Sequence, residues 1–101
     1  MKVRQGDMLL ARVDGLPEDA KRSDEEGPFV VLARGEATGH AHVVPAEDVE
    51  LFWGRGGRHL RVLRETRLTH PEHAAIELPP GTYRIVYQRE FTPRAAVWVR
   101  D

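Results

Sequence analysis

Turn signals divide this sequence into short segments, and that division limits the possible folds more than any single motif does. Glycine and proline recur between the apolar runs, as at residues 14–17, 35–39, 54–58 and 79–81. The intervening segments show no helical periodicity over ten or more residues. Short strands at regular spacing, separated by turns, are typical of β-sandwiches and small β-barrels. We therefore predict a small single-domain all-β fold, either a barrel or a sandwich.

Two segments carry the clearest strand patterns. Residues 28–34 are almost continuously apolar, which predicts a strand buried on both faces. Residues 82–90 alternate, so that Tyr83, Ile85 and Tyr87 share one face. Further strands are expected at residues 7–13, 39–44, 49–53, 59–64 and 74–78, and a short strand or helical turn at residues 95–99. We interpret the chain, residues 1–101, as one β domain in which the polar, acidic residues 18–27 form a solvated loop.

The composition excludes several classes of protein. The chain has no cysteine, so neither a disulfide framework nor a thiolate metal site is possible. Its apolar runs are too short to cross a bilayer as helices. Residues 1–7 lack the apolar segment of a signal peptide. We therefore expect a cytoplasmic protein with no membrane contact.

Charge is distributed unevenly along the chain. Residues 1–54 hold six Lys and Arg against eleven Asp and Glu, whereas residues 55–101 hold nine arginines against five acids. The arginine-rich second half indicates an alternative function, a non-catalytic module that binds RNA or an acidic protein. We also expect a homodimer, with Trp53 or Trp98 in an interface of paired edge strands.

Four of the five histidines fall in two pairs. His40 and His42 are two residues apart in a predicted strand, where side chains at that spacing share a face. His70 and His73 form the second pair, about thirty residues later. Two strand histidines can chelate one ion when a facing segment supplies a further ligand. We therefore predict a metal site of His40, His42 and His73, with Glu47 or His70 completing or supporting it.

The predicted ligands are nitrogen and oxygen donors, which suit zinc, iron, manganese or nickel. Three protein ligands leave a position for water or a small-molecule substrate, as in a metal-dependent enzyme. A metal-free alternative is a phosphodiesterase or nuclease in which His40 and His70 or His73 act as base and acid. Arg84 or Arg89 would then contact the phosphate.

Part of this pattern resembles the cupin family. His40 and His42 form its His-x-His pair, Glu47 follows at the cupin spacing, and the turn at residues 79–81 resembles that of the second cupin motif. The resemblance implies a cupin-like barrel with a metal held by the two histidines and Glu47. It is incomplete, because Arg84 stands where cupins place their last metal-binding histidine.

The chain also resembles a group of small uncharacterised bacterial proteins of about this length. The shared pattern is RQGD at residues 4–7, GEATGHAH at 35–42, THPEH at 69–73, LPPGTY at 78–83 and QREF at 88–91. This resemblance spans nearly the whole chain and implies a complete protein. It implies no activity, because none is established for the group.

Overall fold

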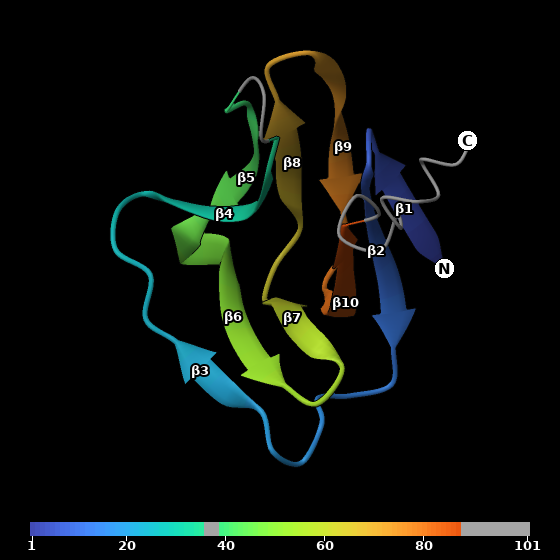
Figure 1. The fold of residues 1–101 in the computed structure, drawn as a ribbon, viewed down its shortest axis with the longest axis vertical. Coiled ribbons are helices and arrows are strands. Elements are labelled where there is room, and N and C mark those ends of the chain that lie inside the picture. Colours follow the sequence, from blue (N-terminus) through green and yellow to red (C-terminus); the bar gives the residue numbers. More distant parts are fainter. Residues whose placement is uncertain (36–38, 88–101) are drawn as a thin grey trace, which may run out of the picture.

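The computed structural model of the protein describes residues 1–35 and 39–87. Over these residues the chain forms ten strands and one short 3-10 helix, arranged as two facing antiparallel sheets (Figure 1). The all-β prediction is thereby confirmed. Of the two predicted architectures, the sandwich is the observed one. No helix in the described ranges is long and apolar enough to span a membrane.

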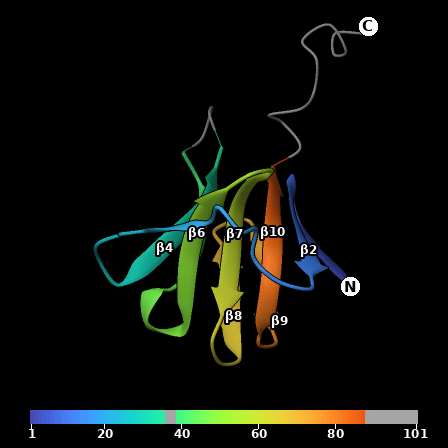
Figure 2. The same cartoon turned by 90° about the horizontal axis from the view of Figure 1, so that it is seen from below.

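The larger sheet has six strands, and β10 lies near its centre between β2 and β7. In spatial order its strands are β1 (Lys2–Gln5), β2 (Met8–Val13), β10 (Gly81–Tyr87), β7 (Gly57–Val62), β6 (Val49–Gly54) and β3 (Lys21–Ser23). The loop from β2 to β3 runs past the β6–β7 turn at one end of this sheet, the end from which Figure 2 views the molecule.

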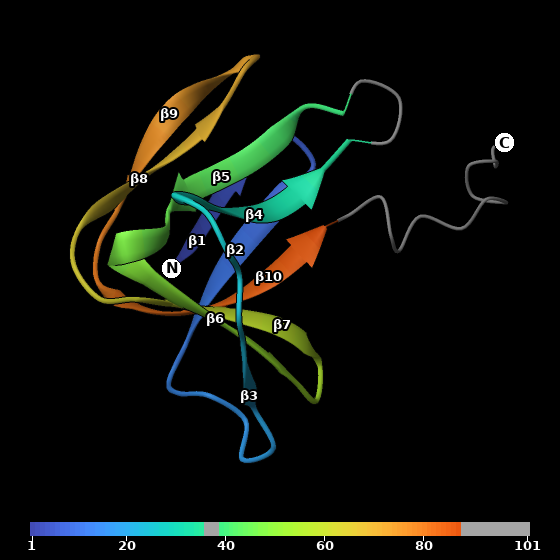
Figure 3. The ribbon, with the colours of Figure 1, turned by 90° about the vertical axis from the view of Figure 1, so that its left-hand side faces the viewer.

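The smaller sheet has four strands and faces the first across the core, as Figure 3 shows from the side. Its strands are, in order, β4 (Phe29–Arg34), β5 (Ala41–Pro45), β8 (Thr66–His70) and β9 (His73–Leu78). The 3-10 helix η1 (Ala46–Asp48) connects β5 to β6 in the larger sheet.

Alternating side chains from both sheets form the core, because successive strand residues point to opposite faces. The predicted face of β10 is the buried one, since Tyr83, Ile85 and Tyr87 are each at most 9% exposed. The largest fully buried partners from other strands are Met8, Leu10, Leu32, Val44, Leu60, Leu68 and Leu78. This core leaves polar side chains at one end of the sandwich, where four of the five histidines lie.

Several local predictions differ from the structure. The stretch at residues 18–27 is not wholly loop, because β3 lies within it and pairs with β6 through backbone hydrogen bonds that need no apolar side chains. The strands β1 and β8 were not predicted, since their residues are largely polar. In β4, Val30 and Leu32 are buried but Phe29 is 54% exposed, so the strand is not covered on both faces. The strand or helical turn predicted at residues 95–99 lies outside the described residues.

Candidate functional site

Four histidines, His40, His42, His70 and His73, meet at one end of the sandwich and are called here the histidine cluster. The His70 ring is central, with its centroid 4.3 Å from that of His42, 4.5 Å from that of His73 and 5.9 Å from that of His40. The His42 and His73 rings are nearly parallel, with centroids 6.2 Å apart. The structure therefore brings both predicted pairs together.

The β8–β9 hairpin holds the second pair. His70 and His73 are register partners on either side of a two-residue turn, an arrangement that places their Cβ atoms about 4.5–5.5 Å apart. The backbone N–H of Glu72, within this turn, donates a hydrogen bond to Nδ1 of His70 at 3.0 Å. A neutral His70 ring with this acceptor nitrogen carries its proton on Nε2.

His42 is fixed from a different direction. It points inward from β5 and is only 4% exposed. Its Nδ1 lies 2.8 Å from Oε1 of Gln5. Because an amide oxygen only accepts hydrogen bonds, Nδ1 is the donor and Nε2 keeps its lone pair. The side chain of Gln5 is itself oriented by two donations from its Nε2, to the backbone oxygens of Leu68 at 3.2 Å and Ala74 at 2.8 Å.

Burial and mutual repulsion favour the neutral form of His42 and of His70. Burial, followed by the charges of His70 and His73, lowers the pKa of His42 to about 4, although the Asp7 carboxylate opposes the shift. Burial, followed by the charges of His73 and His40, also lowers the pKa of His70. Neutral imidazole is the form that binds metal ions or accepts a proton.

The β1–β2 turn is a part of the site that the sequence reasoning missed. Gln5 and Met8 are register partners, so Gly6 and Asp7 form a two-residue turn between the strands. A Cβ placed on Gly6 would lie 2.6 Å from Nε2 of His73, so only glycine leaves room for that ring. The available signal was the RQGD motif at residues 4–7, which meets the histidine motifs in space.

The donor atoms of the cluster do not surround a single point. Among residues 1–35 and 39–87, no three His, Asp or Glu side chains are placed as an ion would require. The rings instead meet at faces and edges, and Nδ1 of His40 lies 3.5 Å from a carboxylate oxygen of Glu72. In solvent exposure the cluster ranges from the buried His42 to the exposed His73.

Two predicted site residues lie away from the cluster. Glu47 is an exposed residue of η1, beyond the end of β5 opposite to His42, and its backbone oxygen accepts a hydrogen bond from Arg64. Arg84 points to the outer face of the larger sheet, because its neighbours Tyr83 and Ile85 face the core, and it donates to the backbone oxygen of Gly56. The structure therefore does not assemble the ligand set that the cupin resemblance implied.

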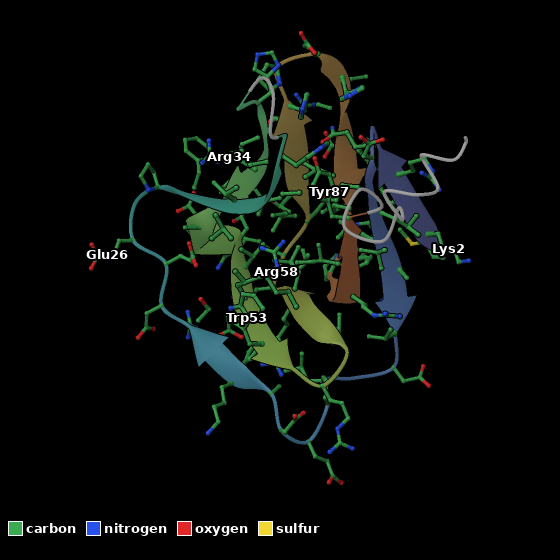
Figure 4. All side chains as sticks on the ribbon, in the orientation of Figure 1. Lys2, Glu26, Arg34, Trp53, Arg58 and Tyr87 are labelled. Atoms are coloured by element: carbon green, nitrogen blue, oxygen red, sulfur yellow. The ribbon has the colours of Figure 1, made fainter. Side chains whose placement is uncertain are left out.

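Other predicted contacts fall elsewhere or cannot be placed. Arg89 and Trp98 lie outside the described residues. Trp53 is 56% exposed at the end of β6, and the guanidinium of Arg58 lies 5.7 Å from its ring centroid (Figure 4). The fifth histidine, His59, belongs to β7 and is 5% exposed between the register partners Phe52 and Arg84.

Comparison with known proteins identifies a family for the chain. A family model described as "Domain of unknown function (DUF8820)" matches residues 4–88, which contain all three motif segments that form the site. No curated protein and no solved structure matches the chain.

Proposed function

The chain belongs to the DUF8820 family of domains of unknown function, and we propose that its histidine cluster binds a divalent transition-metal ion. The observation that carries the proposal is the buried hydrogen bond from Nδ1 of His42 to Gln5. Histidines that bind metals almost always donate their other ring N–H to a carbonyl or carboxylate oxygen. Gln5 supplies that oxygen and leaves Nε2 of His42 available as the ligand atom.

The lowered pKa values of His42 and His70 support the same proposal. A metal ion competes with protons for an imidazole lone pair, so a ring with a low pKa loses little affinity at neutral pH. The pKa of His42 is lowered to about 4, and that of His70 is also lowered. Neither ring has to release a proton at pH 7 before it binds an ion.

The rings of three cluster histidines lie at separations near those around one shared ion, although their nitrogen atoms do not surround a common point. Three ring nitrogens at about 2.0–2.1 Å from a tetrahedral ion place the ring centroids about 5 Å apart. The observed centroid distances among His42, His70 and His73 are 4.3, 4.5 and 6.2 Å, which lie on both sides of that value. Binding of one ion would therefore require the rings of His70 and His73 to rotate, and for His70 a rotation would break the hydrogen bond from the Glu72 N–H.

Solvent access determines whether such an ion could also bind water or a small molecule. His73 and Glu72 are exposed and His40 is half-buried, so one side of the cluster faces water. An ion held by three protein ligands keeps a position for water or for an oxygen atom of a small molecule. The site would then resemble a catalytic metal centre more than a closed structural one.

The test uses protein purified without a histidine tag. We expect Zn²⁺, Ni²⁺, Mn²⁺ or Fe²⁺ to raise the melting temperature, because an ion at a hundred times its Kd adds about 2.7 kcal/mol to the free energy of unfolding. His42→Ala should abolish the rise, whereas His59→Asn should retain it, because His59 lies outside the cluster. The proposal is wrong if metal analysis finds no bound ion and none of the four ions changes the melting temperature.

A further inference from the structure

We propose that two copies of this chain pair through the free edge of β4, so that their smaller sheets join into one antiparallel sheet. The proposal goes beyond the proposed function, because β4 contributes no residue to the histidine cluster. It gives the expected homodimer a specific edge strand and a specific register.

β4 is the edge strand with the least protection against pairing. Proteins protect sheet edges with short strands, charged side chains or a covering segment. β3 has three residues, of which two are basic, and β1 also carries two basic residues. The edge strand β9 lies beside β1, since Gln5 donates to the backbone oxygen of Ala74. In β4, by contrast, the first five residues are apolar, and Phe29 is 54% exposed.

The pairing of β4 with β5 determines which backbone groups face the free edge. The N–H of Ala46 donates to the backbone oxygen of Pro28 at 2.8 Å, and the register partners next to these residues are Phe29 and Pro45. This bond marks Phe29 and Pro45 as a non-hydrogen-bonded pair, in agreement with the missing N–H of proline. The two kinds of pair alternate, so Val31 belongs to the next non-hydrogen-bonded pair. The N–H and C=O groups of Phe29 and Val31 therefore point away from β5.

These groups match those of a second copy in one antiparallel register. Around a two-fold axis, Phe29 of each copy faces Val31 of the other, and every one of these N–H and C=O groups gains a partner. Val30 then faces Val30 of the second copy at the axis. The ring of Phe29 lies opposite a β-branched side chain, which is a favourable cross-strand pair. The ladder ends at the irregularity between Val31 and Ala33.

The charges that flank β4 fit the same register. Glu26 precedes Val30 by four residues, and Arg34 follows it by four. The pairing therefore brings Glu26 of each copy near Arg34 of the other. Both side chains are exposed (Figure 4), and Glu26 forms no ion pair within the described part of its own chain. The two ends of β4 are thus complementary to those of a second copy.

An added strand at this edge would also cover Trp53. This residue follows the buried Leu51 by two positions in β6 and so faces the same way, yet it is 56% exposed. Arg58 lies over its ring and donates to the backbone oxygen of Leu32, which places the ring beside β4. The larger sheet therefore extends past the β4 edge, and a strand of the second copy would lie over this extension.

The first experiment uses the absence of native cysteine. Residues of a non-hydrogen-bonded pair have Cα atoms about 4.5 Å apart, which is within the range of a disulfide. We expect Val30→Cys, oxidised mildly with EDTA present, to give a covalent dimer of twice the 11.5 kDa chain mass. Val44→Cys is the matched control, because Val44 is the β5 partner of Val30 and is also buried. If Val30→Cys cross-links no more than Val44→Cys, the register is wrong.

The second experiment is sedimentation equilibrium in EDTA, which excludes association through a metal ion. Glu26→Arg or Arg34→Glu alone places like charges together at both ends of the interface and should weaken the dimer about tenfold or more. The double variant exchanges the two charges and should restore the wild-type Kd. Glu65→Arg makes the same change of charge at an exposed residue between β7 and β8 and should leave the Kd unchanged.

The outcomes separate this proposal from the proposed function. A double variant that associates no better than the single variants would overturn the contact between Glu26 and Arg34. A wild type that remains monomeric up to millimolar concentration would overturn the dimer altogether. Neither result affects metal binding by the histidine cluster, which is measured separately. Circular dichroism of each variant checks that it remains folded.

Discussion

Nδ1 of His42 and Oε1 of Gln5 lie 2.8 Å apart although 37 residues separate them in the sequence. The bond joins the smaller sheet to the larger one, since His42 belongs to β5 and Gln5 to β1. Two further donations from Gln5 reach the backbone of β8 and of β9. The amide of Gln5 therefore links β1 to three strands of the smaller sheet and orients the most buried histidine of the cluster.

Replacement of this amide should destabilise the protein. Gln5→Ala would leave Nδ1 of His42 and two backbone oxygens without their partner, and each buried unsatisfied group costs about 1–3 kcal/mol. Urea unfolding should show the midpoint fall, while Ser23→Ala, a control that removes only an exposed hydrogen bond to Glu25, should change stability by less than about 0.5 kcal/mol. An unchanged midpoint in Gln5→Ala would contradict the structural role assigned to the amide.

The low pKa of His42 predicts a dependence of stability on pH in the metal-free protein. In the folded state the pKa is about 4, against 6.5 for an unperturbed histidine. The contribution of His42 is therefore fully present above pH 6.5, and it falls as the pH drops towards 4, because the unfolded chain takes up a proton that the folded chain does not. The expected loss is up to about 3 kcal/mol over that interval.

The measurement is a series of urea titrations between pH 7 and pH 4, with the wild type compared with His42→Gln. The variant cannot titrate at this position, so its stability should fall less steeply over the same interval. The histidine resonances of the wild type give the pKa values directly. A His42 resonance that titrates near pH 6.5 would contradict the prediction.

The strands of the core could be predicted because their signal is local. In β10 the alternation of Tyr83, Ile85 and Tyr87 with polar neighbours fixes both the strand and its buried face. In β3 the residues are polar, and pairing with β6 depends only on backbone hydrogen bonds. Backbone hydrogen bonding produces no residue pattern that the sequence would show. Prediction from the hydrophobic pattern therefore misses edge strands of this kind.

The site was predictable only in part for a related reason. The spacing of His40 and His42 predicted one strand face, but β5 begins at Ala41, and the two rings each contact His70. The short turn after His70 predicts its proximity to His73. Sequence spacing also suggested Glu47, but η1 follows β5 directly and carries that residue away from the cluster. Gln5 has no comparable signal, because its partners His42, Leu68 and Ala74 are 37, 63 and 69 residues away.

On the other side of the sandwich, Arg58 links the larger sheet to the smaller one, and this contact gives a separate prediction. Its guanidinium, from β7, donates to the backbone oxygen of Leu32 in β4 and lies over the ring of Trp53. Hydrogen bonds from charged groups contribute about 1.5–3 kcal/mol. We expect Arg58→Ala to lower the free energy of unfolding by this amount and to shift the fluorescence of Trp53. Arg55→Ala is the control, because this arginine is exposed in the same hairpin; equal effects of the two substitutions would contradict the role of Arg58.

The contact between Gly6 and His73 can be separated from backbone strain by a pair of glycine substitutions. Both Gly6, at φ +61°, and Gly56, at φ +87°, adopt conformations that favour glycine, but a Cβ on Gly56 would meet no atom within 4 Å. Gly56→Ala should therefore cost about 1 kcal/mol from backbone strain alone. Gly6→Ala should cost more, because the new methyl group would lie 2.6 Å from Nε2 of His73 and must displace that ring.

Urea unfolding of the two variants measures this difference, and the double variant Gly6→Ala with His73→Ala isolates its cause. Removal of the ring should eliminate the extra cost of Gly6→Ala, so that the remaining loss at Gly6 resembles the loss at Gly56. If Gly6→Ala and Gly56→Ala destabilise the protein equally, the β1–β2 turn does not contact the histidine cluster as the structure describes.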